Sequence, residues 1–286
     1  MPEVLTFETP SLGDRSYLVT DGVVAVAIDP QRDIDRFTRA AEDAGVAITH
    51  VCETHVHNDY VSGGPALAAA TGATYVVAKG SGVQVDHEAV VDGSEVTTGD
   101  LVLRVLATPG HTPDHVAYAL VDEAEVTDVF TGGSLLYGAV GRTDLISDDL
   151  TQELARSQFR SAHRLAQELP ETARVQPTHG FGSHCASVST DEMARSGTIG
   201  EERARNPALV TSDEDDFVAQ LLAGLHPYPA YYVHMGPRNA EGADAPDLSP
   251  PTPVDEEALR QHLEAGHWVV DLRTRRAFAA DHVGGT

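Results

Sequence analysis

The sequence predicts an α/β fold in which helices face two β-sheets. Segments with strand character alternate with segments whose apolar residues recur at helical spacing. The length of 286 residues suits one large domain with a small appendage. Three predicted strands each lead into a loop that carries histidine. We therefore expect an α/β sandwich with strand-end loops along one edge.

The first part of the chain mixes short strands with two helices. The helix predicted over 34–44 ends at Gly45, a plausible C-cap, and an alanine-rich helix over 65–71 is closed by Gly72. Strand character is found over residues 4–8, 16–20, 23–29, 47–52 and 74–77.

The same alternation continues to about residue 175, where the longest helical pattern covers 151–169. A helix over 213–222 begins with acidic residues, which suits its dipole. The rigid aromatic segment 226–234 is expected to pack against the main domain rather than to cover a cleft. Further strands are predicted over residues 101–106, 116–120, 126–130 and 173–175.

The loop after the buried strand 47–52 concentrates metal-binding side chains. It reads THVHNDY over residues 54–60 and places His55, His57 and Asp59 within five residues. Side chains on an extended loop can converge on one point, as a metal site requires. An isolated H-x-H motif is more often chance than a site, and most histidines are surface or capping residues. Here two further histidine loops follow in order, which favours a metal site.

Those two loops are Thr-Pro-Gly-His-Thr-Pro, which carries His111, and Pro-Thr-His-Gly-Phe-Gly-Ser, which carries His179. His55, His57 and His111 form a predicted three-histidine set with one open position, adequate for zinc or ferrous iron. Asp59 and His179 are predicted as outer or supplementary ligands.

These elements resemble the metallo-β-lactamase fold superfamily, whose motifs are T-H-x-H-x-D-H, P-G-H-T, F-T-G-D and T-H-G. The resemblance covers about residues 1–200 and implies an αββα sandwich with a C-terminal extension. The string Gly141-Arg142-Thr143-Asp144 looks most like the persulfide dioxygenase and glyoxalase II branch, and leans towards the persulfide dioxygenases.

The chain departs from the superfamily pattern at two positions. Tyr60 replaces a histidine that holds the second metal, and Gly133 replaces the aspartate that bridges both metals. The second site then keeps only Asp59 and His179, whereas a hydrolytic zinc normally has three protein ligands. A two-zinc hydrolase is therefore disfavoured.

Persulfide dioxygenases hold iron with two histidines and one carboxylate. The resemblance places those histidines at His55 and His111, and the carboxylate position is Gly133. Asp59 is the first candidate to replace it, with Asp144 and Asp114 more distant. One metal ion is expected, with Fe(II) favoured and Zn(II) as the alternative.

Three further residues are candidates for roles at the site. Arg142 either binds a substrate carboxylate as a bidentate donor or pairs with Asp144 to brace its loop. Cys185 either meets a sulfur substrate or is a small buried residue like Cys52. Tyr60, grouped with Asp59 as a catalytic candidate, either donates a hydrogen bond to a metal-bound ligand or fills the volume of the absent second metal.

The C-terminal end resembles the opening of a rhodanese domain, D-x-R-x-x-x-x-F-x-x-G-H-I-x-G. A helix over 259–265 and a strand over 268–273 precede the matching residues 276–285. The catalytic cysteine of such a domain would fall after Thr286, so we expect a truncated rhodanese-like part. The predicted organisation is a main domain over 1–238 (core 1–200, extension 201–238), a linker over 239–253 and a rhodanese-like segment over 254–286.

Composition excludes several classes of partner. The net charge of −25 disfavours nucleic acid and anionic membranes, because like charges repel. Two cysteines without a secretory signal fit a reducing cytoplasm. A small-molecule thiol or persulfide is the expected substrate, and homo-oligomerisation stays open.

Three functions remain at this point. The first is oxidation of a low-molecular-weight persulfide to sulfite and thiol at a mononuclear iron centre. The second is metal-assisted hydrolysis of a thioester. The third is a metal-free scaffold without catalysis, which the residues Tyr60 and Gly133 keep open.

Overall fold

The computed structural model describes residues 2–180, 182–187 and 196–286. It divides the chain into two compact units, Met1–Pro246 and Asp247–Thr286. In the first unit, six strands form one sheet in the order β1-β2-β3-β4-β5-β6. Strands β3, β4 and β5 run parallel, so their carboxyl ends meet at one edge. The strands are β1 (Glu3–Thr9), β2 (Asp14–Thr20), β3 (Val24–Ile28), β4 (Ala47–Cys52), β5 (Thr74–Ala78) and β6 (Glu88–Val90).

A second sheet has the order β11-β10-β9-β8-β7. Neighbouring strands are antiparallel except for the parallel pair β10 and β11. Strands β8, β10 and β11 therefore point the same way, and the loops that follow them leave the same edge. The strands are β7 (Glu95–Thr98), β8 (Leu101–Ala107), β9 (Val116–Asp122), β10 (Glu125–Gly132) and β11 (Arg174–Pro177).

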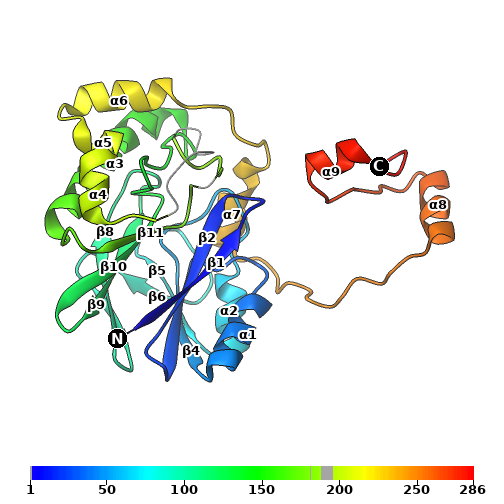
Figure 1. Cartoon of the computed structure of the whole chain (residues 1–286), viewed down its shortest axis with the longest axis horizontal. Helices are drawn as coiled ribbons and strands as arrows, with labels where there is room; N and C mark the ends of the chain where they lie inside the picture. Colours follow the sequence, from blue (N-terminus) through cyan, green and yellow to red (C-terminus); the bar gives the residue numbers. More distant parts are fainter. Residues whose placement is uncertain (1, 181, 188–195) are drawn as a thin grey trace. The chain divides into compact units, whose positions relative to one another are not determined.

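Helices cover the outer face of each sheet (Figure 1). On the first sheet lie α1 (Asp35–Ala44) and α2 (Gly64–Thr71), which bury Phe37 and Leu67 against it. On the second lie α3 (Asp148–Glu168), α4 (Ile199–Arg205), α5 (Pro207–Val210) and α6 (Glu214–Ala223). Burying each such large apolar side chain contributes about 1.5–3 kcal/mol.

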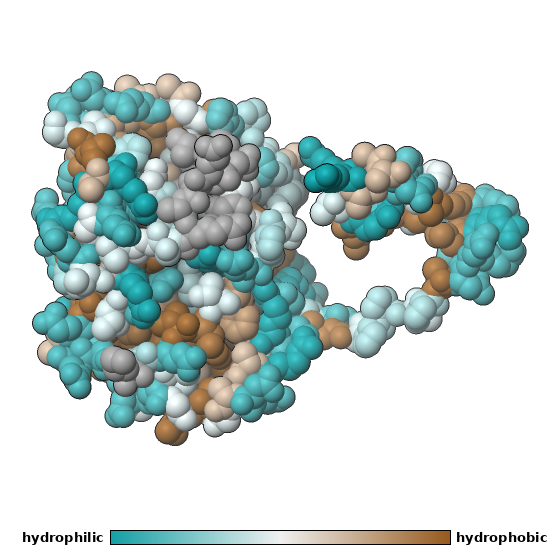
Figure 2. Space-filling view, viewed as in Figure 1, coloured by the Kyte–Doolittle hydropathy of each residue, from teal (hydrophilic) through white to brown (hydrophobic). Residues whose placement is uncertain are grey.

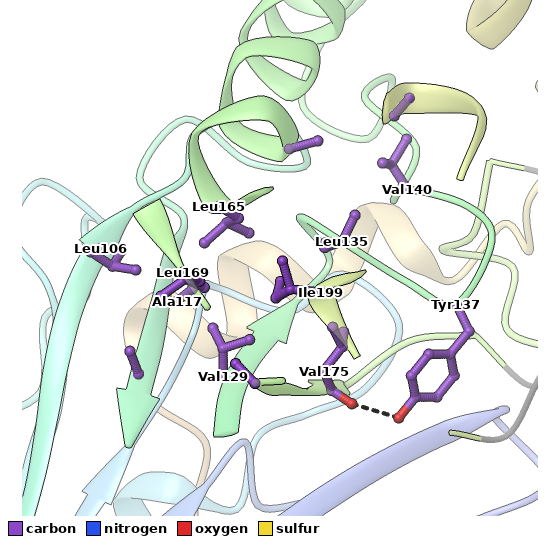
Figure 3. Packing of buried hydrophobic residues seen from close by; sticks show 14 of the residues in the cluster. Leu106, Ala117, Val129, Leu135, Tyr137, Val140, Leu165, Leu169, Val175 and Ile199 are labelled. Atoms are coloured by element: carbon purple, nitrogen blue, oxygen red, sulfur yellow. Dashed lines mark hydrogen bonds between the residues drawn. The ribbon is translucent and has the colours of Figure 1, made fainter. Parts of the chain in front are cut away.

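Three apolar layers hold the sandwich together. Between the sheets, Tyr17 packs edge-on against Phe130 with 5.1 Å between the ring centroids. Figure 3 shows the layer between the second sheet and its helices, where Leu165 of α3 faces Val129 of β10. In the same layer the Tyr137 hydroxyl donates to the Val175 carbonyl at 2.6 Å. The predicted α/β sandwich is therefore confirmed.

Several elements were not predicted from the sequence. The short strands β6 and β7 and the helices α4, α5 and α7 (Tyr232–Glu241) are additions to the expected set. Helix α7 starts within the aromatic segment and continues to Glu241, so Asn239 is helical. The sequence did contain a signal for α4, because Thr198 and Glu201 form a capping box.

The unit Asp247–Thr286 contains α8 (Glu256–Glu264) and α9 (Arg275–Ala280). The strand predicted over 268–273 is wrong, because the structure has no strand over those residues and pairs them with none. Trp268 and Leu272 are more than 90% exposed, at 94% and 92%. Figure 2 shows hydrophobic residues open to view on this unit. The rhodanese-like resemblance of this segment stays a prediction.

Candidate metal centre

Four strand ends bring the predicted site residues together. His55 follows β4, His111 follows β8, Gly133 follows β10 and His179 follows β11. One potential ligand atom from each of His55, His111 and His179 lies within 4.8 Å of the others, and all three side chains are buried. Imidazoles from three separate loops thus lie close together.

The spacing of these rings suits one bound cation. His55 Nε2 and His179 Nε2 are 3.2 Å apart. A tetrahedral ion with metal–nitrogen bonds of 2.0–2.1 Å places its ligand nitrogens about 3.3 Å apart. The ring centroid of His111 lies 4.8 Å from that of His55 and 5.2 Å from that of His179.

Hydrogen bonds to Nδ1 orient two of the rings. The Thr54 hydroxyl donates to Asp29 Oδ2 at 2.7 Å, so it accepts at 2.9 Å from His55 Nδ1. His111 Nδ1 donates to the Arg142 carbonyl at 2.7 Å. Both rings therefore carry the proton on Nδ1 and present an Nε2 lone pair, the form that a metal ligand needs.

His179 is anchored by carboxylates instead. Its Nδ1 lies 3.0 Å from Asp14 Oδ1 and 3.2 Å from Asp59 Oδ2. Burial opposes the charged form, but Asp59 and Asp14 raise the pKa of His179 to about 9. Its Nε2 proton can then be shared with His55 Nε2, and a cation would displace that proton.

The electrostatics of the other two rings favour metal binding. Burial and the neighbouring imidazoles hold the pKa of His55 well below its ordinary value, and burial lowers the pKa of His111 to about 3. Both rings stay neutral. His111 Nε2 is buried and has no hydrogen-bond partner among the described residues. Because such an atom is costly to bury unpaired, its lone pair fits a ligand role.

His57 is not grouped with these three, and the predicted trio of His55, His57 and His111 stays a prediction. The His57 ring lies 4.1 Å from that of His55 between centroids, and His57 Nδ1 is buried without a hydrogen-bond partner among the described residues. Its Nε2 instead faces Glu53 Oε2 at 3.1 Å, Asp29 Oδ1 at 3.3 Å and the Tyr60 hydroxyl at 3.0 Å. Burial opposes protonation, but the Asp29 and Glu53 carboxylates hold the pKa of His57 well above its ordinary value. His57, Asp29 and Glu53 form a second group of potential ligands.

Asp59 and Tyr60 have distinct surroundings. Asp59 Oδ1 is buried without a hydrogen-bond partner in the described part of the chain, and Asp59 groups with His57 and His179 as potential ligands. The Tyr60 hydroxyl lies 3.2 Å from the Asp29 carbonyl, and its ring stacks on His57 with centroids 4.3 Å apart. Asp59 therefore touches the centre through His179, and Tyr60 contacts the His57 group.

Gly133, where the superfamily has an aspartate, packs directly against His111. A Cβ added to it would lie 2.3 Å from His111 Cδ2 and 2.6 Å from His111 Cγ. The Gly133 amide donates to His115 Nε2 at 2.9 Å, and the His115 ring stacks on His55 with 4.8 Å between centroids. The imidazole of His111 fills the space in which an aspartate side chain would begin.

Arg142 and Cys185, predicted to bind substrate, are both buried. Arg142 Nε and Nη2 donate to the two carboxylate oxygens of Asp144, each at 2.7 Å. This pairing is the one that the bracing alternative requires, and substrate binding by Arg142 or Cys185 stays a prediction. Burial, and then the charge of Asp59, raise the pKa of the Cys185 thiol, which keeps it protonated. Phe181 of the third histidine loop lies outside the described residues.

Sequence reasoning missed several residues around the candidate centre, including Asp14 beside His179. Asp29 accepts from the Thr54 amide and from the hydroxyls of Thr54 and Thr178, so it ties two histidine loops together. Asn239 of α7 donates to the His57 and Tyr60 carbonyls at 2.8 and 2.9 Å. His115 could have been predicted, because it lies only four residues after His111 in the sequence. Asn239 had no local signal, because its contacts span about 180 residues.

Comparison with known proteins shows which enzymes the chain is similar to. The sequence model of the family described as "Metallo-beta-lactamase superfamily" matches residues 15–179.

In the part of the chain that the structure describes, no helix has the length and apolar character needed to cross a membrane.

Two relatives are enzymes of different classes. The mitochondrial persulfide dioxygenase ETHE1 of Bos taurus is 32% identical over 216 residues, which cover 75% of this chain and 75% of that protein. The hydroxyacylglutathione hydrolase of Maricaulis maris is 30% identical over 244 residues, covering 74% of this chain and 89% of that one. The crystal structure of ETHE1 from Myxococcus xanthus is also similar, with a TM-score of 0.71 at 30% identity, and covers 83% of this chain and 98% of that one.

Proposed function

The chain belongs to the metallo-beta-lactamase superfamily, and on that premise we propose that it oxidises a low-molecular-weight persulfide with dioxygen. The balanced reaction converts RSSH, O₂ and H₂O into RSH, sulfite and two protons. The likeness to a persulfide dioxygenase over three-quarters of the chain supports this choice. So does the string Gly141-Arg142-Thr143-Asp144, which resembles the persulfide dioxygenase and glyoxalase II branch and leans towards the persulfide dioxygenases.

The observation that carries the proposal is the convergence of three buried imidazoles with oriented Nε2 atoms. His55, His111 and His179 would hold one ion and leave coordination positions open for small ligands. Ferrous iron bound there would supply the redox chemistry that brings dioxygen to a sulfur atom. Asp14 and Asp59 are the carboxylates in contact with this set, at 3.0 and 3.2 Å from His179 Nδ1.

The chain's own residues fix the centre and exclude water from it. Thr54 and the Arg142 carbonyl set the ring orientations of His55 and His111, and Asp14 with Asp59 sets that of His179. All three rings are at most 4% exposed, so bulk water does not compete for the Nε2 atoms. Such outer contacts change metal affinity about 10–100-fold when they are removed.

A second candidate function is hydrolysis of a thioester with zinc. The specific observation in its favour is that the set is composed entirely of histidine, because three imidazoles and one open position suit a catalytic zinc. The hydroxyacylglutathione hydrolase relative also supports it.

One experiment separates these functions. Protein reconstituted anaerobically with ferrous iron, and in parallel with zinc, is analysed for metal content and given a panel of persulfides and thioesters. We expect about one iron per chain, oxygen uptake and one sulfite per dioxygen. His111→Ala should abolish both metal and turnover, whereas His87→Ala, remote from the centre, should change neither. Bound iron without oxygen uptake on any persulfide would overturn the proposal, and thioester cleavage by the zinc form would then support the alternative.

A further inference from the structure

A cavity of about 510 Å³ lies beside the loops that carry the metal-centre histidines. Val56 and Asn58 of the first histidine loop and Thr112 of the second form one side of it. Helix α7 forms another side through Val233, Gly236, Pro237 and Ala240, and residues 144–148, which lead into α3, form a third.

The position of this cavity suits the organic part of a substrate. Val56 lies between His55 and His57 in the chain, and Thr112 directly follows His111. A molecule that occupies the cavity therefore has its inner end next to the loops that present the imidazoles. The volume is within the range of small-molecule sites, which is about 300–1,000 Å³.

The charged residues that line the cavity are all acidic. Its lining includes the carboxylates of Asp114, Asp144 and Asp148 and, among the residues that the structure describes there, no Lys, Arg or His. The Asp144 carboxylate is neutralised by Arg142. Asp114 and Asp148 make no ion pair with a described residue, and burial raises the pKa of Asp114. The overall charge of −25 adds to this negative potential.

The neighbouring arginine is not available to an anionic ligand. The side chain of Arg142 is 3% exposed, and both oxygens of Asp144 occupy its Nε and Nη2. Its Nη2 also donates to the His226 carbonyl at 2.8 Å, and its Nη1 to the His184 carbonyl at 3.1 Å. The Tyr228 ring covers the guanidinium at 4.6 Å. A substrate carboxylate would have to break these contacts to reach it.

The other lining groups suit an uncharged polar molecule. Asn58 is buried, and its side-chain amide nitrogen has no hydrogen-bond partner among the described residues. It can donate to a hydroxyl or amide oxygen in the cavity. Ser81 and Thr112 add uncharged hydrogen-bonding groups, while Ile146 and Val233 add apolar surface.

From this lining we infer that the cavity selects a persulfide whose organic part has hydroxyl, amide or ammonium groups and no carboxylate. Such groups donate hydrogen bonds to Asp114 and Asp148, whereas a dicarboxylate such as glutathione meets like charge without a cation to balance it. This inference rests on the proposed function, because it assigns the substrate class of the same site.

The test compares three persulfides on the iron-loaded, full-length protein. The persulfides of 2-mercaptoethanol and cysteamine should show kcat/KM about tenfold or more above that of glutathione persulfide. The double substitution Asp114→Asn with Asp148→Asn should reduce this preference at least about threefold. Asp149→Asn, which removes a charge from the same turn of α3 outside the cavity lining, should leave the preference unchanged.

A binding measurement supplies a readout that needs no turnover. The S-methyl thioethers of the same three thiols are titrated calorimetrically into the protein, and S-methylglutathione should bind most weakly. The inference would be overturned, and the proposed function left intact, by either of two results. In the first, all three persulfides are turned over and glutathione persulfide has the highest kcat/KM. In the second, the double substitution leaves the ratio of kcat/KM values unchanged. Absence of turnover on all three with iron bound would instead overturn the proposed function.

Discussion

Replacement of Gly133 by alanine perturbs the metal centre through a single methyl group. The new Cβ would lie 2.3 Å from His111 Cδ2 and 3.0 Å from His111 Nε2. Ordinary carbon contacts are about 3.5–4.0 Å, so the ring or the Gly133 backbone must move by about 1 Å. The ring has little freedom, because it is fully buried and His111 Nδ1 is bonded to the Arg142 carbonyl.

The cost follows from this overlap. Insertion of a methyl group into a well-packed region costs about 1–3 kcal/mol of unfolding free energy. For a domain of this size each kcal/mol lowers Tm by about 2–4 °C, so a decrease of roughly 2–12 °C is expected. Movement of His111 Nε2 by even a few tenths of an ångström exceeds the tolerance of about 0.2 Å on ligand distances. Metal affinity should therefore fall about tenfold or more.

Thermal unfolding and competition with a chromophoric chelator measure the two effects. Gly224→Ala is the matched control, because the nearest atom to its Cβ would be 3.3 Å away and its φ is −85°. Gly133→Asp adds a carboxylate at the position where the superfamily has one, so it tests whether a new ligand outweighs the steric overlap with His111. We expect this variant to bind metal no more tightly than Gly133→Ala. If Gly133→Ala behaved like Gly224→Ala, or Gly133→Asp bound metal more tightly than the parent protein, the packing argument would be refuted.

Three further predictions concern the surroundings of the centre. Asn239→Ala removes three hydrogen bonds to the first histidine loop and the residues after it, including one from the Ser62 amide at 2.8 Å. Because buried backbone groups are then left unpaired, urea unfolding should show that the free energy of unfolding falls by about 2 kcal/mol or more. Zinc at a hundredfold excess over its Kd should stabilise the protein by about 2.7 kcal/mol, and differential scanning calorimetry should show no such gain in His111→Ala. His57→Gln should retain about one zinc per chain by elemental analysis, because His57 faces carboxylates; loss of the ion would show that His57 is a ligand.

Sequence patterns predicted the fold well where local periodicity and burial agree. The helix over 34–44 and the strands that precede the histidine loops were found because their apolar spacing is regular. Strands β6 and β7 have only three and four residues, too few to show a period. Helix α7 contains Gly236 and Pro237, residues that locally disfavour a helix.

The identity of the metal-centre histidines was predictable only in part. Three loops that each carry a histidine were visible in the sequence, but the sequence does not decide whether His57 or His179 completes a ligand set with His55 and His111. In the structure, Asp29 and Glu53 contact His57 Nε2 at 3.3 and 3.1 Å. Glu53 immediately precedes the first histidine motif, whereas Asp29 follows another strand, so only the tertiary structure shows that both carboxylates face His57.

The most direct test of the centre is X-ray absorption at the zinc edge of the zinc-loaded protein. The structure predicts one ion per chain with three imidazole nitrogens at about 2.0–2.1 Å, and an unchanged spectrum for His57→Gln. Fewer than three imidazole ligands, or a second metal at about 3.5–4 Å, would contradict a single centre formed by His55, His111 and His179.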